Sequence, residues 1–131
     1  MKYRTEKQIK RRKEERKGLP DFYKHHISIS KNRKCENCGL KIKNPGTKNI
    51  AHIIPKSRFK SVNDNLDNYL FLCSNFDRFD GKMGCHERYD KSWSSAMSMP
   101  VWKLAVERFN KFKHLIVEKS RILEYFNYDK K

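Results

Sequence analysis

Cys35-Glu36-Asn37-Cys38 opens a stretch, ending at Asp90, that holds all four cysteines of the chain and two of its five histidines. The other segments that carry the pattern are Ala51-His52-Ile53-Ile54-Pro55-Lys56-Ser57, Asn68-Tyr69-Leu70-Phe71-Leu72-Cys73 and Cys85-His86-Glu87-Arg88-Tyr89-Asp90. Each segment alone is a common pattern. Their order and spacing together are much harder to obtain by chance, so this stretch is expected to decide the fold and to carry the chemistry.

The cysteines have the number and spacing of a zinc site. Cys35 and Cys38 are separated by two residues, so that one tight turn can aim both thiolates at one ion, and Cys73 and Cys85 would complete a set of four. A shell of four protein ligands leaves no position open for water, so this zinc would be structural. Two alternatives are that the cysteines are simply buried apolar residues, and that His86 replaces Cys85 as the fourth ligand.

The ordered set resembles the HNH endonuclease family, which are zinc-stapled nucleases of the ββα-metal (His-Me finger) class, from about Cys35 to Trp93. The resemblance implies that His52 is the general base and that His86 is a ligand of a catalytic divalent ion. It assigns Asn68 to tying together the two sides of the hairpin loop and orienting the base. The family usually has a second CxxC pair, so residues 74–84, between Cys73 and Cys85, would be an insertion that loops out.

A carboxylate four residues after His86 strengthens the case for a catalytic ion. On a helix, Asp90 would share a face with His86, and together they could hold Mg²⁺ or another divalent ion. The family often places another ligand immediately before the base, where this chain has Ala51. Either His86 and Asp90 hold the ion with water and phosphate oxygens, or Asp77 or Asp80 swings in, or the site is weakened.

The charge of the chain points to a polyanionic partner. It has 31 lysines and arginines against 15 aspartates and glutamates, a formal net charge of +16. Nucleic acid is the first candidate and an anionic membrane surface the second. No apolar run approaches a membrane span and no signal core is seen, so we expect a cytoplasmic protein of a bacterial or phage-infected cell. The expected phosphate contacts are Lys10, Arg11, Arg12, Lys56, Arg58 and Lys60.

The pattern predicts a small α+β fold in one compact domain. Residues 1–20 read as a basic helical arm that ends at Gly18-Leu19-Pro20, residues 21–98 as the zinc-stapled core, and residues 99–131 as one long helix with an apolar stripe. That helix would pack on the core, or pair two copies of the chain. His25 and His26 read as surface or phosphate-contacting residues, and Trp93 and Trp102 as core.

The function expected from these features is metal-dependent cleavage or nicking of DNA, and the resemblance implies a nuclease of phage or mobile-element type. A second hypothesis is a non-catalytic zinc-containing module that binds DNA or RNA, which Ala51 favours. A third is an RNA-binding or ribosome-associated protein, supported only by charge. The presence of His52 with His86 and Asp90 favours the first, because binding alone needs none of them.

Overall fold

A two-stranded antiparallel sheet lies at the centre of the computed structural model, which describes residues 17–126. Strands β1 (Ile50–Ala51) and β2 (Leu70–Phe71) pair Ile50 with Phe71 and Ala51 with Leu70. All four strand residues are buried, as expected for short apolar runs covered on both faces. The fold is small and α+β as predicted.

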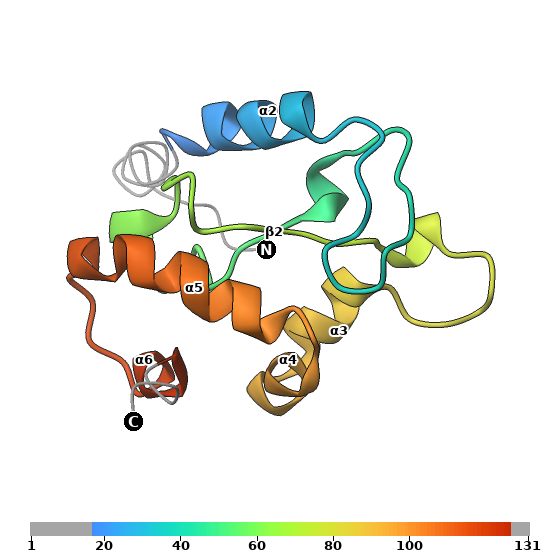
Figure 1. Ribbon diagram of the computed structural model, residues 1–131. Helices are drawn as coiled ribbons and strands as arrows, with labels where there is room; N and C mark the ends of the chain where they lie inside the picture. The colour runs from blue at the N-terminus through green and yellow to red at the C-terminus, as the bar shows by residue number, and fades with distance from the viewer. Residues whose placement is uncertain (1–16, 127–131) are drawn as a thin grey trace, which may run out of the picture.

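Helices cover the sheet from both sides. Figure 1 shows β2 running between α2 on one side and α5 on the other, with α3, α4 and α6 grouped near α5. The α-helices are α2 (Leu19–Ile29), α3 (Cys85–Lys91), α4 (Trp93–Ser98), α5 (Trp102–Phe112) and α6 (Ile122–Phe126). Single 3₁₀ turns are η1 (Thr47–Asn49), η2 (Lys60–Val62), η3 (Asn75–Asp77) and η4 (Lys113–Leu115).

The segment Gly18-Leu19-Pro20 begins a helix, and the prediction that it only ends one is wrong. Pro20 lies in the first turn of α2, where its missing N–H would have no partner in any case. Leu19, Phe22 and His26 form the buried face of α2. The predicted basic arm, including Lys10, Arg11 and Arg12, lies almost entirely outside the described residues.

The C-terminal segment is two helices and not one. The chain is extended at Ile116, and α6 starts six residues later. The Phe126 ring stacks on Phe109 at a centroid distance of 4.5 Å, whereas a straight helix would separate these residues by about 25 Å. Stacking therefore requires the break. The connection is fastened by the Glu118 carboxylate, which accepts hydrogen bonds from the backbone N–H, at 3.0 Å, and the hydroxyl of Ser61.

His26 is buried, so the prediction of a surface residue is wrong for it. The residue is 2% exposed. Its ring stacks on Tyr69 at a centroid distance of 3.7 Å and makes an edge contact with Phe22 at a centroid distance of 4.8 Å. Neither ring nitrogen makes a hydrogen bond of ordinary geometry. Burial, together with the neighbouring His25, lowers the pKa of His26 to about 4, although the Leu66 backbone opposes the shift in part.

This burial predicts a specific loss of stability in mild acid. The unfolded chain takes up a proton as the pH falls through about 6.5, whereas folded His26 takes one up only near 4, so the folded state loses stability between these values. We expect His26→Phe, which keeps the aromatic stack, to abolish about 2 kcal/mol of the fall in unfolding free energy between pH 7 and pH 5. Urea unfolding at both pH values measures this, with exposed His114→Phe as control. An equal fall in unfolding free energy between pH 7 and pH 5 in wild type and His26→Phe would contradict the prediction.

Candidate functional site

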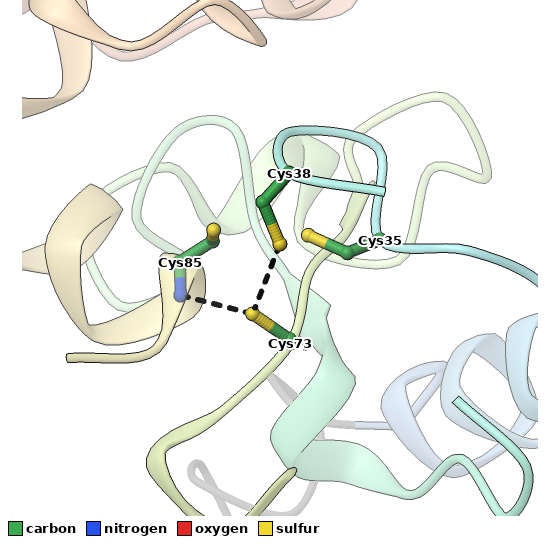
Figure 2. Close-up of side chains that lie close together, drawn as sticks. All are labelled: Cys35, Cys38, Cys73 and Cys85. Atoms are coloured by element: carbon green, nitrogen blue, oxygen red, sulfur yellow. Dashed lines mark hydrogen bonds between the residues drawn. The ribbon is translucent and has the colours of Figure 1, made fainter. Parts of the chain in front are cut away.

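The four cysteines form one cluster. Their sulfur atoms all lie within 4.8 Å of one another, and none is in a disulfide. Figure 2 shows them converging from three segments: the turn that carries Cys35 and Cys38, the chain that follows β2, and the start of α3. The 3.7 Å between the sulfurs of Cys38 and Cys73 is close to the edge, about 3.8 Å, of a tetrahedron with Zn–S bonds of about 2.3 Å. The cluster can hold a metal ion, and Cys85, not His86, is its fourth member.

The turn between Cys35 and Cys38 is fastened by its two middle residues. Glu36 exchanges hydrogen bonds with the backbone of Phe71 at 2.8 and 2.6 Å, and its carboxylate accepts two from the Arg108 guanidinium of α5 at 2.8 and 2.5 Å. Asn37 donates to the Cys85 sulfur at 3.3 Å and accepts from the backbone N–H of Val101 at 3.0 Å. The sequence pattern identified the cysteines but missed this support, because nothing in the local sequence pairs Glu36 with an arginine so distant in the chain.

The surroundings of the cluster lower the thiol pKa of Cys35 and raise those of Cys73 and Cys85. A hydrogen bond with the Cys85 side chain lowers the pKa of the Cys35 thiol to about 4, whereas burial raises the pKa of Cys73. The Arg78 guanidinium lies 3.5 Å from the Cys38 sulfur and 3.8 Å from the Cys73 sulfur. A cationic donor at this position favours the thiolate form, which is the form that binds metal.

A cavity of about 710 Å³ gathers the other predicted site residues. It is lined from α2, β1 and α3 and the loops beside them. His52, His86 and Asp90 all line it, as does Lys56. Of the remaining predicted phosphate contacts, Arg58 and Lys60 are exposed on the surface and do not line this cavity.

His52 directly follows β1 and is held in one orientation. Its Nε2 lies 2.8 Å from the backbone oxygen of Asn63, and Phe22 stacks on the ring at a centroid distance of 4.7 Å. Because a carbonyl oxygen can only accept, Nε2 carries the proton and Nδ1 has the free lone pair of the neutral ring. Burial lowers the pKa of His52 to about 4, although the Asn63 hydrogen bond opposes this. The ring is therefore neutral near pH 7 and can accept a proton at Nδ1.

Asn68 ties together the two ends of the loop after His52. Its buried side chain accepts from the backbone N–H of Ile54 at 3.1 Å and donates to the oxygens of Val62 and Ile54 at 3.2 and 3.5 Å. Val62 is the neighbour of Asn63, whose carbonyl orients His52. Asn68 thus acts on His52 through the loop, because its side chain hydrogen-bonds to Ile54 and Val62 and not to the ring.

His86 and Asp90 approach each other on successive turns of α3. The Nδ1 of His86 makes a short hydrogen bond with the backbone oxygen of Lys48, and its Nε2 lies 3.1 Å from Asp90 Oδ2. Burial lowers the pKa of His86, but the Asp90 carboxylate and the Lys48 carbonyl outweigh it, so the net pKa is raised. Donation from Nδ1 leaves Nε2, beside a carboxylate, as a possible ligand, so the pair can hold a divalent ion. Buried Ala51 adds no third ligand.

The carboxylates of Asp77 and Asp80, considered as replacement ligands, are engaged elsewhere. Asp77 accepts from the backbone and hydroxyl of Ser74 at 2.8 and 2.9 Å and from the Asn49 amide at 2.7 Å. Asp80 pairs with Arg78 at 2.6 and 3.1 Å. Neither lines the cavity, so the geometry does not support recruitment of either residue.

Sequence reasoning missed two lysines of the cavity. Lys48 and Lys91 line it beside Lys56, as does Tyr23, whose hydroxyl accepts a hydrogen bond from the Lys56 ammonium at 3.0 Å. Lys91 follows Asp90 directly, which was an available signal; Lys48 joins the site only through the long-range contact with His86. Trp93 lines the cavity and also meets the Trp102 ring at a centroid distance of 6.4 Å.

Comparison with known proteins does not identify the chain. No protein-family model, curated protein or solved structure matches it. Within residues 17–126, no helix is both long enough and apolar enough to cross a membrane. The chemistry of the cluster and of the cavity therefore has to indicate what the protein does.

The role of Asn68 can be measured as stability. Asn68→Ala would leave the Ile54 N–H and the Val62 carbonyl buried without their side-chain partner, so we expect the free energy of unfolding to fall by about 1–3 kcal/mol. Denaturant unfolding would show the change. Asn44→Ala, on the exposed surface, is the matched control and should stay within about 0.5 kcal/mol of wild type. A loss no larger for Asn68→Ala than for this control would refute the bracing role.

Proposed function

We propose that the chain is a metal-dependent DNA endonuclease of the HNH class, with a structural zinc on the four cysteines and a catalytic divalent ion at His86 and Asp90. The observation that carries the proposal is the convergence of a neutral, oriented His52 with the His86–Asp90 pair on one cavity. Three lysines, Lys48, Lys56 and Lys91, line the same cavity. Base, ion ligands and cationic groups are the components that phosphodiester hydrolysis requires.

His52 would act as the general base. Its Nδ1 takes a proton from a water molecule, while the Asn63 carbonyl, which accepts from Nε2, stabilises the imidazolium that forms. The stacked Phe22 ring covers one face of the imidazole and limits its rotation. A divalent ion bound at His86 and Asp90 supplies positive charge for the phosphate and for the departing 3′ oxygen. The lysines bind the flanking phosphates as point charges.

The zinc would act on catalysis through position. Cys73 accepts from the backbone N–H of Cys85 through its sulfur at 3.4 Å and from the N–H of His86 through its carbonyl at 2.9 Å. Locking the cluster therefore fixes the first turn of α3 against the end of β2. His86, the residue after Cys85, is set by that turn.

A binding module without catalysis is the second candidate. Ala51 supports it, because β1 offers no ligand from the position before His52. Asp90 Oδ2 lies 3.1 Å from His86 Nε2, a distance at which the two can also form an ordinary ion pair. A plasmid-nicking assay with and without added divalent metal separates the two functions, since a module that only binds would leave the plasmid intact in both.

The structural zinc predicts a metal content and a dependence of folding on it. We expect about one zinc per chain in freshly purified protein, and we expect chelation to unfold the region from Cys35 to Asp90, because metal-binding energy becomes folding energy in such sites. Elemental analysis and circular dichroism with added chelator measure both. Cys73→Ser should lower zinc content, with Ser98→Ala as a neutral control. Absence of zinc from the purified protein would contradict the assignment.

The general base predicts a large rate effect. His52→Ala should reduce nicking by about 10²–10⁴-fold, because a positioned base typically contributes that much, while zinc content and DNA affinity stay near wild type. Unfolding free energy is measured alongside, since Phe22 loses its stacked partner. His114→Ala, exposed and outside the cavity, is the control. Equal cleavage by wild type and His52→Ala would rule out this mechanism.

His86→Ala should fail in a different way. It removes an ion ligand and not a base, so part of its activity should return as the divalent-ion concentration is raised, by mass action. Asp90→Asn should behave like His86→Ala if both residues hold the ion. Nicking activity titrated against Mg²⁺ for the three variants distinguishes these roles. If Mg²⁺ restored the activity of His52→Ala as much as that of His86→Ala, the assignment of His52 as base and His86 as ion ligand would be contradicted.

A further inference from the structure

The loop of residues 75–83, here called the aromatic loop, presents large apolar side chains to solvent. Phe79 is 98% exposed, Phe76 78% and Met83 45%. Exposed apolar groups gathered on one short segment indicate a contact surface more strongly than the same groups scattered singly. The loop lies within the eleven-residue spacer, residues 74–84, between Cys73 and Cys85. A CxxC pair would have only two residues there.

These rings are exposed although the loop itself is tightly fastened. At its start, the Ser74 hydroxyl accepts from the Phe76 N–H at 3.2 Å, and Asp77 accepts from Asn49 at 2.7 Å. At its end, Gly84 donates to the Asn75 side chain at 2.6 Å, and a Cβ added at Gly84 would lie 2.3 Å from the Ser74 carbonyl carbon. The two ends are thus packed against each other, and Phe76 and Phe79 are exposed on the segment between them.

The aromatic loop adjoins the cavity through one residue. The Lys48 ammonium lies 5.4 Å from the centre of the Phe76 ring, in a cation–π arrangement. The same Lys48 lines the cavity, and its carbonyl accepts the hydrogen bond of His86. Phe76 therefore lies beside the cavity. A ligand that places a phosphate in the cavity would present the neighbouring part of the same ligand to this ring.

A nucleobase is the group that matches this arrangement. It is flat, has a π-face, and is joined to a phosphate through a sugar. The chain carries a formal net charge of +16, which attracts polyanions such as nucleic acids. Asp77 and Asp80 offset Arg78 and Lys82, so the loop adds no net charge of its own and its contribution is the rings. In a fully paired duplex both faces of each base are already covered by neighbours, so a protruding ring can stack only where bases are unpaired or unstacked.

We propose that the aromatic loop stacks on unpaired nucleobases beside the scissile phosphate, which makes bulged or otherwise locally unpaired DNA the preferred substrate. This inference rests on the proposed nuclease function for its reference to the scissile phosphate. Phe79 and Phe76 are the stacking residues, and Lys48 joins the contact of Phe76 to the cavity.

The test compares two DNA probes that differ only in pairing. A fluorescent duplex with a three-nucleotide bulge and the fully paired duplex of the same sequence are titrated with full-length protein carrying His52→Ala, so that neither is cut. Adding Phe76→Leu and Phe79→Leu keeps apolar side chains but removes the π-faces. We expect affinity for the bulged probe to fall about 10-fold, with the paired probe within about twofold, since stacking on one base contributes on that scale.

Two further variants sharpen the comparison. Phe79→Trp, which keeps a π-face, should retain the preference for the bulged probe, and Val117→Ala, which removes an apolar side chain that is 78% exposed elsewhere, should leave both affinities unchanged. Equal affinity losses on both probes, or no loss on either, would overturn the proposal. So would concentration-dependent self-association of the protein that the two leucine substitutions abolish, because the loop would then be a protein interface.

The outcome also separates this inference from the proposed function. If the wild-type protein nicks DNA and the leucine substitutions change neither probe, the nuclease assignment stands and the stacking role is wrong. If no nicking is found with any divalent ion but the bulge preference still depends on Phe76 and Phe79, the stacking role stands in a DNA-binding module. Nicking assays on the bulged and paired probes therefore accompany the binding measurements, and they use protein that retains His52.

Discussion

The junction at Cys73 is the constraint on which the rest of the molecule depends. Its sulfur joins the cysteine cluster, and its carbonyl and sulfur accept from the first two N–H groups of α3. Four thiolates at this spacing repel one another strongly unless a cation lies between them. Within residues 17–126 the sheet consists of two strands of two residues each, so the contacts made by Cys73 are an important link between β2 and α3. Metal binding at the cluster would therefore set the geometry of the neighbouring cavity as well as the stability of the fold.

The two cavity histidines show how one residue type acquires two chemistries. Burial beside Phe22 lowers the pKa of His52 and stabilises its neutral form, although the hydrogen bond to the Asn63 carbonyl opposes the shift. His86 faces the partly exposed Asp90 carboxylate, so its pKa rises. Environments that move two titratable groups apart are typical of sites that divide acid–base and ligand roles. The raised pKa favours the protonated form of His86, so a divalent ion at this position would have to displace the proton from Nε2.

Local patterns in the sequence predicted what depends on neighbours in the chain, and failed where distant contacts decide. The CxxC turn and the helical spacing that puts Asp90 beside His86 are encoded within a few residues and are present. The burial of His26 depends on Tyr69, and the break after α5 depends on Phe126 returning to Phe109; neither contact is visible in local periodicity. Likewise, the cysteine spacing identified the cluster, but only the fold brings Glu36 to Arg108.

The spacer between Cys73 and Cys85 has to satisfy opposite demands on its two sides. Four thiolates and one divalent ion carry a formal charge of about −2, which would disfavour a DNA phosphate approaching nearby. Arg78 turns inward from this loop to the sulfurs of Cys38 and Cys73, where its charge offsets part of theirs. Asp77 turns back toward Ser74 and Asn49 and so is kept out of the cavity. With Arg78 and Asp77 engaged by the fold, Phe76 and Phe79 remain as the large exposed side chains of the loop. In the proposed nuclease, these rings would meet DNA without adding negative charge beside the phosphate.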